Sequence, residues 1–512
     1  MRSSPVLVAL FLLLSTAVVA QKGSLYAPGE LLVKFRPETS AASQASSHKA
    51  AGAEVVKTFS HLGWHVVKLE GRRSVESALR SYSSASYIEA AQPNYYYQLL
   101  NTPNDPDFPL PGMYGLTKIS APAAWNLTTG SSDVVVAVID SGIRLTHEDL
   151  AANIWTNPGE IPNNGIDDDG NGFIDDYNGW DFRHNVFDPT DQHGHGTHVS
   201  GTIGAVGNNG IGVVGVNWNV RLMPIKIYNA GGSDTTSSML IAAYEYVRMM
   251  KLRGVNIRVT NNSYGGCAEA CSYDQATRDA IDALGEADIL NVFAAGNAGV
   301  NIDVQPFYPA SYNLPDILSV GASNSNDDRV FNFGPVGVDL AAPGVGIRST
   351  TNANNSSYGN SSGTSMAAPH VAGAAALIAA YHPTLSARSL KATIMNNVDV
   401  LPQWQGFVKT GGRLNVANAL LSPTVCNLEL SQNQVLMPTK GGYLTIEVAA
   451  APNCDYSVKR SAKWMFVETG DVNSGTATLR IRVGFNSTVA RSGTITIGDK
   501  TLTIRQSREE FF

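Results

Sequence analysis

The stretch from Gly363 to His382 constrains the fold of this chain more than any other. It begins with the small-residue turn Gly363-Thr-Ser-Met and continues as an almost uninterrupted run of alanines and other apolar residues. Ala is the best helix former, and a helix that is apolar on every side belongs in a core. Ser365 stands where the turn meets this helix, and we expect Pro369 within the first helical turn, where proline is tolerated. Such a serine is either the N-cap of a buried helix or a nucleophile whose own N–H faces developing negative charge.

Two further stretches place polar side chains next to buried elements. Asp133–Asp140 is a continuous β-branched run, which predicts a buried parallel strand that ends in the carboxylate of Asp140. Ligands bind at the carboxyl ends of such strands, although an Asp there can also cap a turn. Gly194-His-Gly-Thr-His-Val-Ser-Gly201 opens a small-residue helix. Its histidines, His195 and His198, are close enough for a zinc pair, but no third ligand stands at metalloprotease spacing.

These three motifs together resemble those of the subtilisin-like serine proteases, or subtilases. The resemblance rests on Val-Ile-Asp-Ser-Gly-Ile around Asp140, His-Gly-Thr-His-Val-Ser-Gly-Thr from His195, and Gly-Thr-Ser-Met-Ala-Ala-Pro-His-Val-Ala-Gly around Ser365. They occur in the order Asp, His, Ser, which is the order in this family. The resemblance covers residues 21 to about 420. It implies an α/β fold, with a parallel-sheet catalytic domain at residues 101–420.

The resemblance also assigns a role to each residue of a hydrolytic site. Ser365 would attack a peptide carbonyl, His195 would take and return the proton, and Asp140 would orient and stabilise the imidazole. Asn297, in the strand-and-turn segment Val292–Gly299, would donate to the oxyanion together with the serine N–H. The expected activity is that of a secreted serine endopeptidase made as a self-processed zymogen. The alternative is a catalytically silent binding or scaffold protein, although all four positions are filled here.

Two segments resemble the edges that bind an extended peptide substrate in subtilases. Ser263, Tyr264 and Gly265 correspond to one wall of the primary specificity pocket, and Gly232 with Ser233 to the other edge. Such edges pair with the peptide backbone, and side-chain pockets set the preference. These segments contain no acidic cluster that would demand Arg or Lys. We therefore expect an apolar or aromatic side chain before the scissile bond.

Acidic loops in the middle of the chain predict structural calcium. The run Asp167–Asp176 spaces oxygen ligands as in a calcium loop, except that Asn178 stands where a bidentate Glu would close it. The alternative is a solvated acidic loop. A second candidate pairs Asp149 with Asn209, in a loop similar to a calcium loop of many subtilases. The expected ligands of the first site are Asp167, Asp169, Asn171, the Phe173 carbonyl and Asp175.

The ends of the chain predict further segments. Residues 1–20 read as a signal peptide, with Arg2, an apolar run and a small residue at the cleavage point. Residues 21–100 predict a small α+β domain, which the resemblance identifies as an inhibitor-type propeptide. Its expected elements are strands at Glu30–Phe35, Trp64–Leu69 and Ile88–Tyr97, and a helix at Val75–Tyr82.

Residues 424–507 change to alternation with period two, which predicts a β-sandwich. This segment resembles BACON-type immunoglobulin-like domains of bacterial secreted enzymes.

An exported chain favours paired cysteines, and three connectivities are open. We favour Cys267–Cys271 and Cys426–Cys454, because each pair then stays inside one domain.

The distribution of charge excludes one class of partner. Residues 101–420 contain 16 Lys and Arg against 29 Asp and Glu, a balance of −13, whereas residues 21–100 contain nine against six, a balance of +3. An acidic central domain argues against nucleic acid. The expected partners are protein or peptide substrates and the chain's own propeptide, which would act as intramolecular chaperone and inhibitor. No apolar run after the first would span a bilayer, and we expect a secreted, extracellular monomer.

Overall fold

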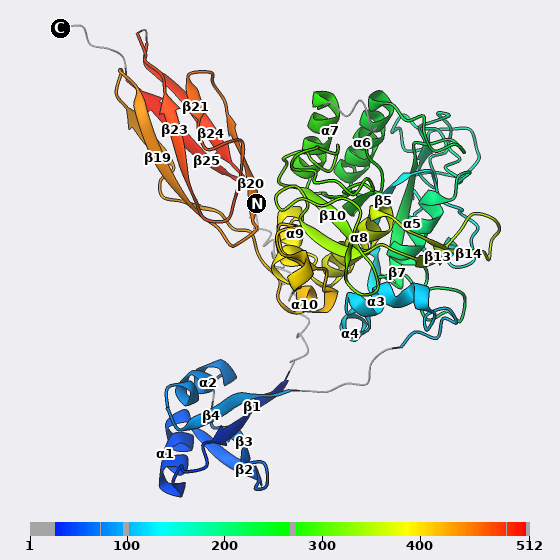
Figure 1. Ribbon diagram of the computed structural model, residues 1–512. Coiled ribbons are helices and arrows are strands. Elements are labelled where there is room, and N and C mark those ends of the chain that lie inside the picture. The colour runs from blue at the N-terminus through cyan, green and yellow to red at the C-terminus, as the bar shows by residue number, and fades with distance from the viewer. Residues whose placement is uncertain (1–25, 72, 96–101, 267–272, 488, 508–512) are drawn as a thin grey trace, which may run out of the picture. The chain divides into compact units, whose positions relative to one another are not determined.

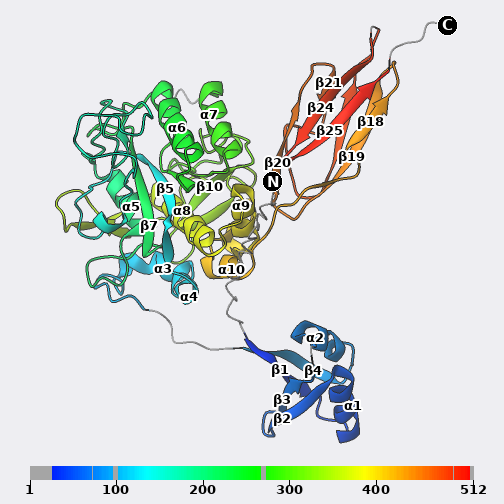
Figure 2. The same ribbon diagram turned by 180° about the vertical axis from the view of Figure 1, so that it is seen from behind.

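The computed structural model describes residues 26–71, 73–95, 102–266, 273–487 and 489–507 (Figures 1 and 2). The chain divides between Leu99 and Leu100 into two compact units. The predicted signal peptide and the predicted cysteines Cys267 and Cys271 lie outside the described residues.

The first unit is a four-stranded antiparallel sheet in the order β2-β3-β1-β4, with two helices packed on it (Figure 1). Its core is small and includes Leu31, Val33, Val67 and Tyr82. Its elements are β1 (Tyr26–Phe35), α1 (Ala41–Ala51), β2 (Ala53–Phe59), β3 (Trp64–Leu69), α2 (Val75–Ser83) and β4 (Ile88–Tyr95).

One strand of this unit, β2, was not predicted from the sequence. In β2 only Ala53 is buried, and every following side chain to Phe59 is exposed. A strand with one solvated face normally shows alternating polarity, and β2 does not show it. Its pairing with β3 therefore comes from the tertiary fold rather than from a local pattern.

The second unit contains a largely parallel sheet in the order β15-β16-β12-β10-β9-β8-β5-β7-β6. The predicted strand Asp133–Asp140 lies within β5, which pairs in parallel with both β7 and β8. This confirms the predicted α/β fold class. The strands are β5 (Gly130–Asp140), β6 (Trp180–Asp181), β7 (Asn219–Lys226), β8 (Ile257–Asn262), β9 (Leu290–Ala294), β10 (Ile317–Ser323), β11 (Arg329–Val330), β12 (Leu340–Pro343), β15 (Asp399–Val400) and β16 (Gly412–Arg413), with a separate hairpin of β13 (Ile347–Thr350) and β14 (Tyr358–Ser361).

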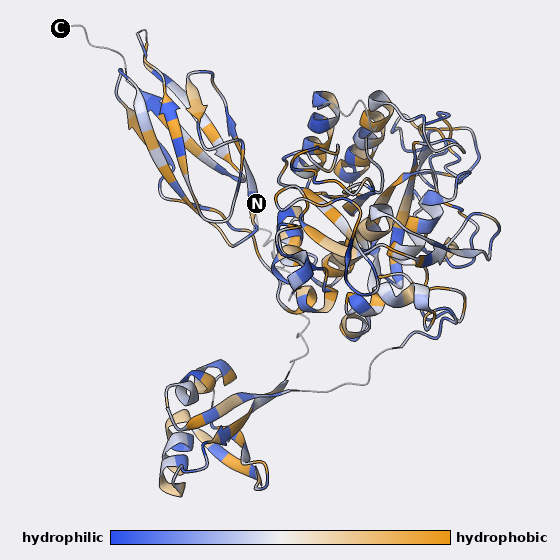
Figure 3. Ribbon diagram, in the orientation of Figure 1, coloured by the Kyte–Doolittle hydropathy of each residue, from blue (hydrophilic) through white to orange (hydrophobic). Residues whose placement is uncertain are grey.

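Helices cover both faces of this sheet, and Figure 3 shows hydrophobic residues along its strands. The Ala-rich helix α8 (Thr364–Tyr381) runs beside the sheet and contacts β5, β8, β9, β10 and β12. Fifteen of its residues are buried, as the sequence predicted for a helix without a polar face. The other helical elements are η1 (Pro111–Met113), α3 (Tyr114–Lys118), α4 (Ala121–Trp125), η2 (Ala151–Asn153), α5 (His195–Gly204), α6 (Ser237–Leu252), α7 (Gln275–Glu286), α9 (Ala387–Asn396), η3 (Pro402–Trp404) and α10 (Val416–Leu421).

The C-terminal part of the second unit contains two sheets that enclose a separate apolar core, consistent with a β-sandwich. The period-two alternation seen in the sequence lies in strands of the structure, for example at Leu444–Val448 within β19 and at Leu502–Gln506 within β25. The first sheet has the order β17-β19-β23-β21, and the second β18-β25-β24-β20-β22. The strands are β17 (Glu429–Leu430), β18 (Gln434–Met437), β19 (Gly442–Ala449), β20 (Asp455–Arg460), β21 (Met465–Val467), β22 (Val472–Ser474), β23 (Ala477–Val483), β24 (Arg491–Ile497) and β25 (Lys500–Gln506).

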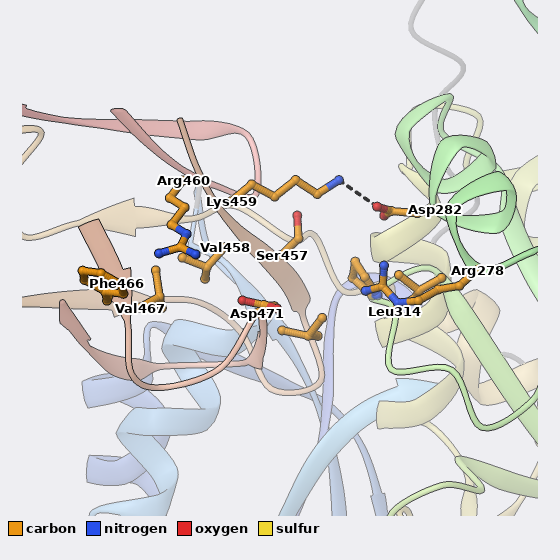
Figure 4. Close-up of a pocket in the computed structure, with 12 residues that line it drawn as sticks. Arg278, Asp282, Leu314, Ser457, Val458, Lys459, Arg460, Phe466, Val467 and Asp471 are labelled. Atoms are coloured by element: carbon orange, nitrogen blue, oxygen red, sulfur yellow. Dashed lines mark hydrogen bonds and ion pairs between the residues drawn. The ribbon is translucent and has the colours of Figure 1, made fainter. Parts of the chain in front are cut away.

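Polar contacts join the sandwich to the α/β part. Lys391 of α9 and Asp455 of β20 form a buried ion pair at 2.7 Å, next to the Cys426–Cys454 disulfide. Lys459 reaches Asp282 and Glu286 on α7, at 2.9 and 2.6 Å; Figure 4 shows the first of these pairs at the rim of a cavity of about 360 Å³. Among the described residues, no helix combines the length and the apolar character that a membrane span requires.

Candidate active site

The predicted catalytic residues lie where strands end and two helices begin. Asp140 is the last residue of β5, Asn297 follows β9, His195 is the first residue of α5, and Ser365 is the second residue of α8. The carboxyl ends of parallel strands meet at one edge of a sheet. All four residues line one cavity of about 380 Å³, so the fold brings together residues that are up to 225 positions apart in the chain.

Asp140 holds His195 by one ring nitrogen. The distances from His195 Nδ1 to the two carboxylate oxygens are 2.8 and 3.0 Å. Asp140 is buried, whereas the His195 side chain is 29% exposed. Burial opposes the charged imidazole, but attraction and hydrogen bonding to Asp140, with a contribution from Asp191, outweigh it and raise the pKa of His195. The pair therefore suits a base that becomes cationic during reaction.

Asp191, which sequence reasoning did not single out, fixes the turn that carries His195. Its carboxylate is buried and accepts from the backbone N–H groups of His193, Gly194 and Thr197 and from the Thr197 hydroxyl. It also accepts from the hydroxyl of Ser141, the residue after Asp140, at 2.9 Å. One carboxylate thus connects the end of β5 to the first turn of α5.

The start of α8 differs from the prediction for Pro369. Because the helix begins at Thr364, Pro369 lies in its second turn rather than its first. Pro has no N–H to donate to the carbonyl four residues earlier, which is that of Ser365. Ser263 Oγ donates to this carbonyl instead, at 2.9 Å. A side chain from the substrate edge therefore supplies the hydrogen bond that the proline removes.

Ser365 also contacts the substrate edge through its own hydroxyl. Ser365 Oγ donates to the Ser263 carbonyl at 3.0 Å. Attack on a substrate requires the side chain to rotate so that the hydroxyl donates to His195 Nε2, which is a staggered-rotamer change about one bond. Catalytic hydrogen bonds of this kind often form only with substrate present.

The amide of Asn297 is oriented by the residue before the serine. Its Oδ1 accepts from the Thr364 N–H and the Thr364 hydroxyl, at 2.8 and 3.0 Å. Within the part of the chain that the structure describes, its Nδ2 group has no acceptor and is left as the donor. A Cβ on Gly363 would lie 3.2 Å from this Nδ2, so glycine leaves room beside it. The arrangement places an amide donor near the Ser365 N–H, as an oxyanion site requires.

The predicted substrate edges lie in the same cavity, with one exception. Ser263, Tyr264, Gly265 and Gly232 line it, whereas Ser233 does not. The Tyr264 hydroxyl is bonded to Tyr244 and Asn262, at 2.6 and 2.9 Å, so its polar end faces the core. Lining residues that sequence reasoning missed are His193, Tyr228 and Phe307.

The predicted calcium loop brings together a different set of carboxylates from the one expected. Oxygens of Glu160, Asp169 and Asp176 lie within 4.8 Å of one another. Glu160 is 5% exposed, and its Oε2 has no hydrogen-bond partner among the described residues. Burial raises the pKa of both Glu160 and Asp176, and the neighbouring carboxylates add to the effect. A buried group of carboxylates with an unpartnered oxygen fits a hard cation.

Other residues of that loop hold its backbone instead. Asp167 accepts from the N–H groups of Asn171 and Gly172, and Asp175 from those of Asn164 and Gly165. The Asn171 amide donates to Asp176 at 2.9 Å, and the Phe173 ring packs against Trp180 and Tyr246. Of the expected ligands, only Asp169 belongs to the cluster.

At the second candidate cation site, Asp149 and Asn209 meet directly. Asn209 Nδ2 donates to Asp149 Oδ1 at 2.8 Å, and the Val213 N–H donates to the other oxygen at 2.9 Å. Asp149 is fully buried, and this burial raises its pKa to about 7. Asp105, which sequence reasoning missed, binds the same loop through the N–H of Asn208.

Comparison with known proteins defines the class. Residues 131–421 match the subtilase family (Peptidase S8), and residues 15–94 match the fervidolysin N-terminal prodomain. The chain therefore belongs to the subtilase family and is a serine endopeptidase that carries a prodomain.

Individual relatives agree with this assignment. A thermophilic serine proteinase from Bacillus sp. (strain AK1) is 33% identical over 364 residues, which cover 70% of this chain and 79% of the relative. Thermitase from Thermoactinomyces vulgaris is 33% identical over 325 residues, covering 62% and 99%. The solved structure of a protease from Pseudoalteromonas arctica is 30% identical with a TM-score of 0.51, and covers 63% of this chain and 99% of that one.

Proposed function

We propose that this chain hydrolyses peptide bonds of proteins through an acyl-enzyme intermediate on Ser365. The observation that carries the proposal is the Asp140–His195 hydrogen bond, in one cavity with Ser365 and the oriented amide of Asn297. Family membership supports the reaction class, and this geometry supports the role proposed for each residue.

The reaction proceeds in two halves. Ser365 Oγ attacks the carbonyl carbon while His195 Nε2 takes its proton, and the resulting oxyanion accepts from the Ser365 N–H and Asn297 Nδ2. The C–N bond breaks as His195 returns the proton to the leaving amine. Water then attacks the ester with His195 as base, and the acid product leaves with the Ser365 hydroxyl restored. Asp140 orients the imidazole and stabilises its cationic form.

A serine-directed fluorophosphonate probe tests this function. We expect one covalent adduct, on Ser365 of the processed protein, and none in Ser365→Ala. An intact, processed protein without an adduct would instead favour a catalytically silent binding or scaffold protein.

We propose further that residues 21–100 assist folding and then inhibit the mature enzyme. The match to a prodomain supports this role, as does the contrast between a +3 segment and a −13 domain. Parallel sheets depend on non-local pairings and fold slowly, so a template has physical value. Separately made residues 21–100 should inhibit peptide hydrolysis by mature enzyme, with association slowing as salt rises. No inhibition at micromolar concentration would reject the inhibitor role.

We also propose that Glu160, Asp169 and Asp176 hold a structural Ca²⁺. The three carboxylates, of which those of Glu160 and Asp176 are buried, repel one another at neutral pH, and a divalent cation removes that cost. Asn157 Nδ2 donates to Asp169 and Asp176, at 3.0 and 2.9 Å, and so fixes two of the three groups. The role of the ion would be stability rather than catalysis.

Export is the remaining part of the proposal. The sequence pattern of residues 1–20 and the prodomain match support a secreted zymogen that processes itself. N-terminal sequencing of protein from the culture medium would identify both cleavage points. Retention of residues 1–20 in that protein would contradict the signal-peptide assignment.

A further inference from the structure

We propose that Phe307 closes the primary specificity pocket, so that the enzyme cleaves after small residues such as Gly, Ala or Ser. This proposal rests on the proposed function, because it concerns the substrate of the same site. It narrows the expectation of an apolar or aromatic side chain before the scissile bond, which was drawn from the two edge segments alone, to small side chains.

The side chain before the scissile bond must lie beside the reacting carbon, next to Ser365. The acyl carbonyl lies at Ser365, with its oxygen between the Ser365 N–H and Asn297 Nδ2. Gly296 directly precedes Asn297, and Gly265 lies two residues after Ser263, whose carbonyl accepts from Ser365 Oγ. The backbones at Gly265 and Gly296 are therefore the two walls beside the reacting carbon, and both line the cavity.

The Phe307 ring fills the space between these walls. A Cβ built on Gly265 would lie 2.0 and 2.3 Å from two ring carbons of Phe307. A Cβ built on Gly296 would lie 3.0 Å from two ring carbons. The same ring is thus in close contact with both backbones, and no aromatic substrate side chain fits there beside it.

Hydrogen bonds of its backbone and apolar packing of its ring hold Phe307 in this place. Its N–H donates to Ser311 Oγ, and its carbonyl accepts from the Ser311 N–H, both at 2.9 Å. The next residue, Tyr308, accepts at its carbonyl from the Gly266 N–H at 2.7 Å, which ties this segment to one wall. The ring also packs against two apolar clusters of the α/β part, so moving it out would expose apolar surface.

Matched peptides test the proposal. Two fluorogenic substrates would differ only in Ala or Phe before the scissile bond. We expect wild-type kcat/KM to favour Ala by at least about tenfold, because even one or two methylenes change discrimination by this much. Phe307→Gly should reverse this order, raising kcat/KM for the Phe peptide by more than about tenfold. Phe407→Ala, which truncates a partly buried ring that does not line the cavity, should leave the ratio unchanged.

The outcomes separate this proposal from the proposed function. A wild-type enzyme that cleaves the Phe peptide as well as the Ala peptide overturns the role of Phe307, while its labelling on Ser365 upholds the triad. Absence of both labelling and cleavage rejects the function itself. If Phe307→Gly does not fold, two measurements replace it. One is the kcat/KM ratio of Phe307→Leu for the two peptides, and the other compares the wild-type affinities for alanine and phenylalanine boronic acids. Equal binding of the two boronic acids overturns the proposal.

Discussion

Two histidines, one in each unit of the chain, show how burial and partners decide protonation. His195 has its pKa raised, because Asp140 and Asp191 outweigh the effect of burial. His48, in the prodomain, has its pKa lowered to about 4, because it is buried and its neighbour is another histidine, His65. The histidine in the catalytic unit therefore binds a proton more readily than usual, and the histidine in the prodomain binds one less readily.

The surroundings of His48 explain the second case. Its Nε2 lies 3.0 Å from His65 Nδ1, and its Nδ1 lies 2.8 Å from the Tyr82 hydroxyl. Glu54, Glu70 and Lys49 line the adjoining cavity, but within the described residues neither acid forms an ion pair with either ring. The catalytic unit places carboxylates against its histidine, and the prodomain places uncharged rings there.

Ser365→Ala should remove activity while leaving both units folded. Peptide hydrolysis should fall by about 10⁶-fold, because the other triad members act only through the nucleophile. Self-processing should stop for the same reason. Steady-state rates and circular dichroism on the purified chain are the measurements. Correctly processed Ser365→Ala in a protease-free system would contradict self-processing.

Asn297→Ala should cost about 10²–10³ in kcat, because one oxyanion donor is lost. KM should change little, since the donor acts where negative charge develops. Asn418→Ala, at an exposed position of α10, is the control for replacing an asparagine. A higher KM with unchanged kcat would instead place Asn297 in substrate binding.

The sequence predicted the catalytic unit best where function depends on long local motifs. Asp140, His195 and Ser365 each lie in a run of specific residues, and their order defined the family. Asp191 and Phe307 were missed because their roles arise from contacts across the fold. Phe307 touches Gly265 and Gly296, 42 and 11 positions away, and no local pattern encodes that.

The calcium loop shows the same limit. Spacing within Asp167–Asp176 suggested a local ligand set, yet several of its carboxylates bind backbone N–H groups. Glu160, seven residues before the loop, completes the cluster instead. Loop spacing predicts the kind of ion, whereas side-chain direction is decided by the fold around it. The cis peptide before Pro309 and the exposed strand β2 were likewise beyond local pattern.

Chelation should destabilise the catalytic unit, whereas the prodomain should be unaffected. Binding to the native state alone contributes about 2.7 kcal/mol at a hundred times the dissociation constant. Melting in EDTA should therefore occur several degrees below melting in millimolar calcium. The gap should narrow as pH falls, because raised carboxyl pKa values let Glu160 and Asp176 protonate in the native state.

Glu160→Gln should lower the melting temperature as EDTA does for the wild type. Adding EDTA to this variant should then cause no further decrease. Glu245→Gln, at an exposed position of α6, is the matched control and should melt like the wild type in both buffers. Equal melting temperatures of wild type in EDTA and calcium would reject the proposed site.

Mild acid should loosen the prodomain through His48. Its folded pKa of about 4 lies below the unfolded value of about 6.5, so the unfolded state binds the proton first. The stability that His48 contributes is therefore full above about pH 6.5 and is lost as pH falls toward 4, by up to about 1.4 kcal/mol per pH unit. Hydrogen exchange of residues 26–95 in the Ser365→Ala chain measures this within the intact protein.

His48→Gln separates this titration from general acid effects. The variant loses the ring that packs against Phe35, so its prodomain should exchange faster at pH 7. Its exchange should nevertheless depend less on pH than that of the wild type, since one of the two histidines with a lowered pKa is gone and only His65 remains. His61→Gln, at an exposed histidine of the same unit, should keep the wild-type dependence. Equal pH dependence in all three chains would mean that burying His48 does not make the prodomain sensitive to acid.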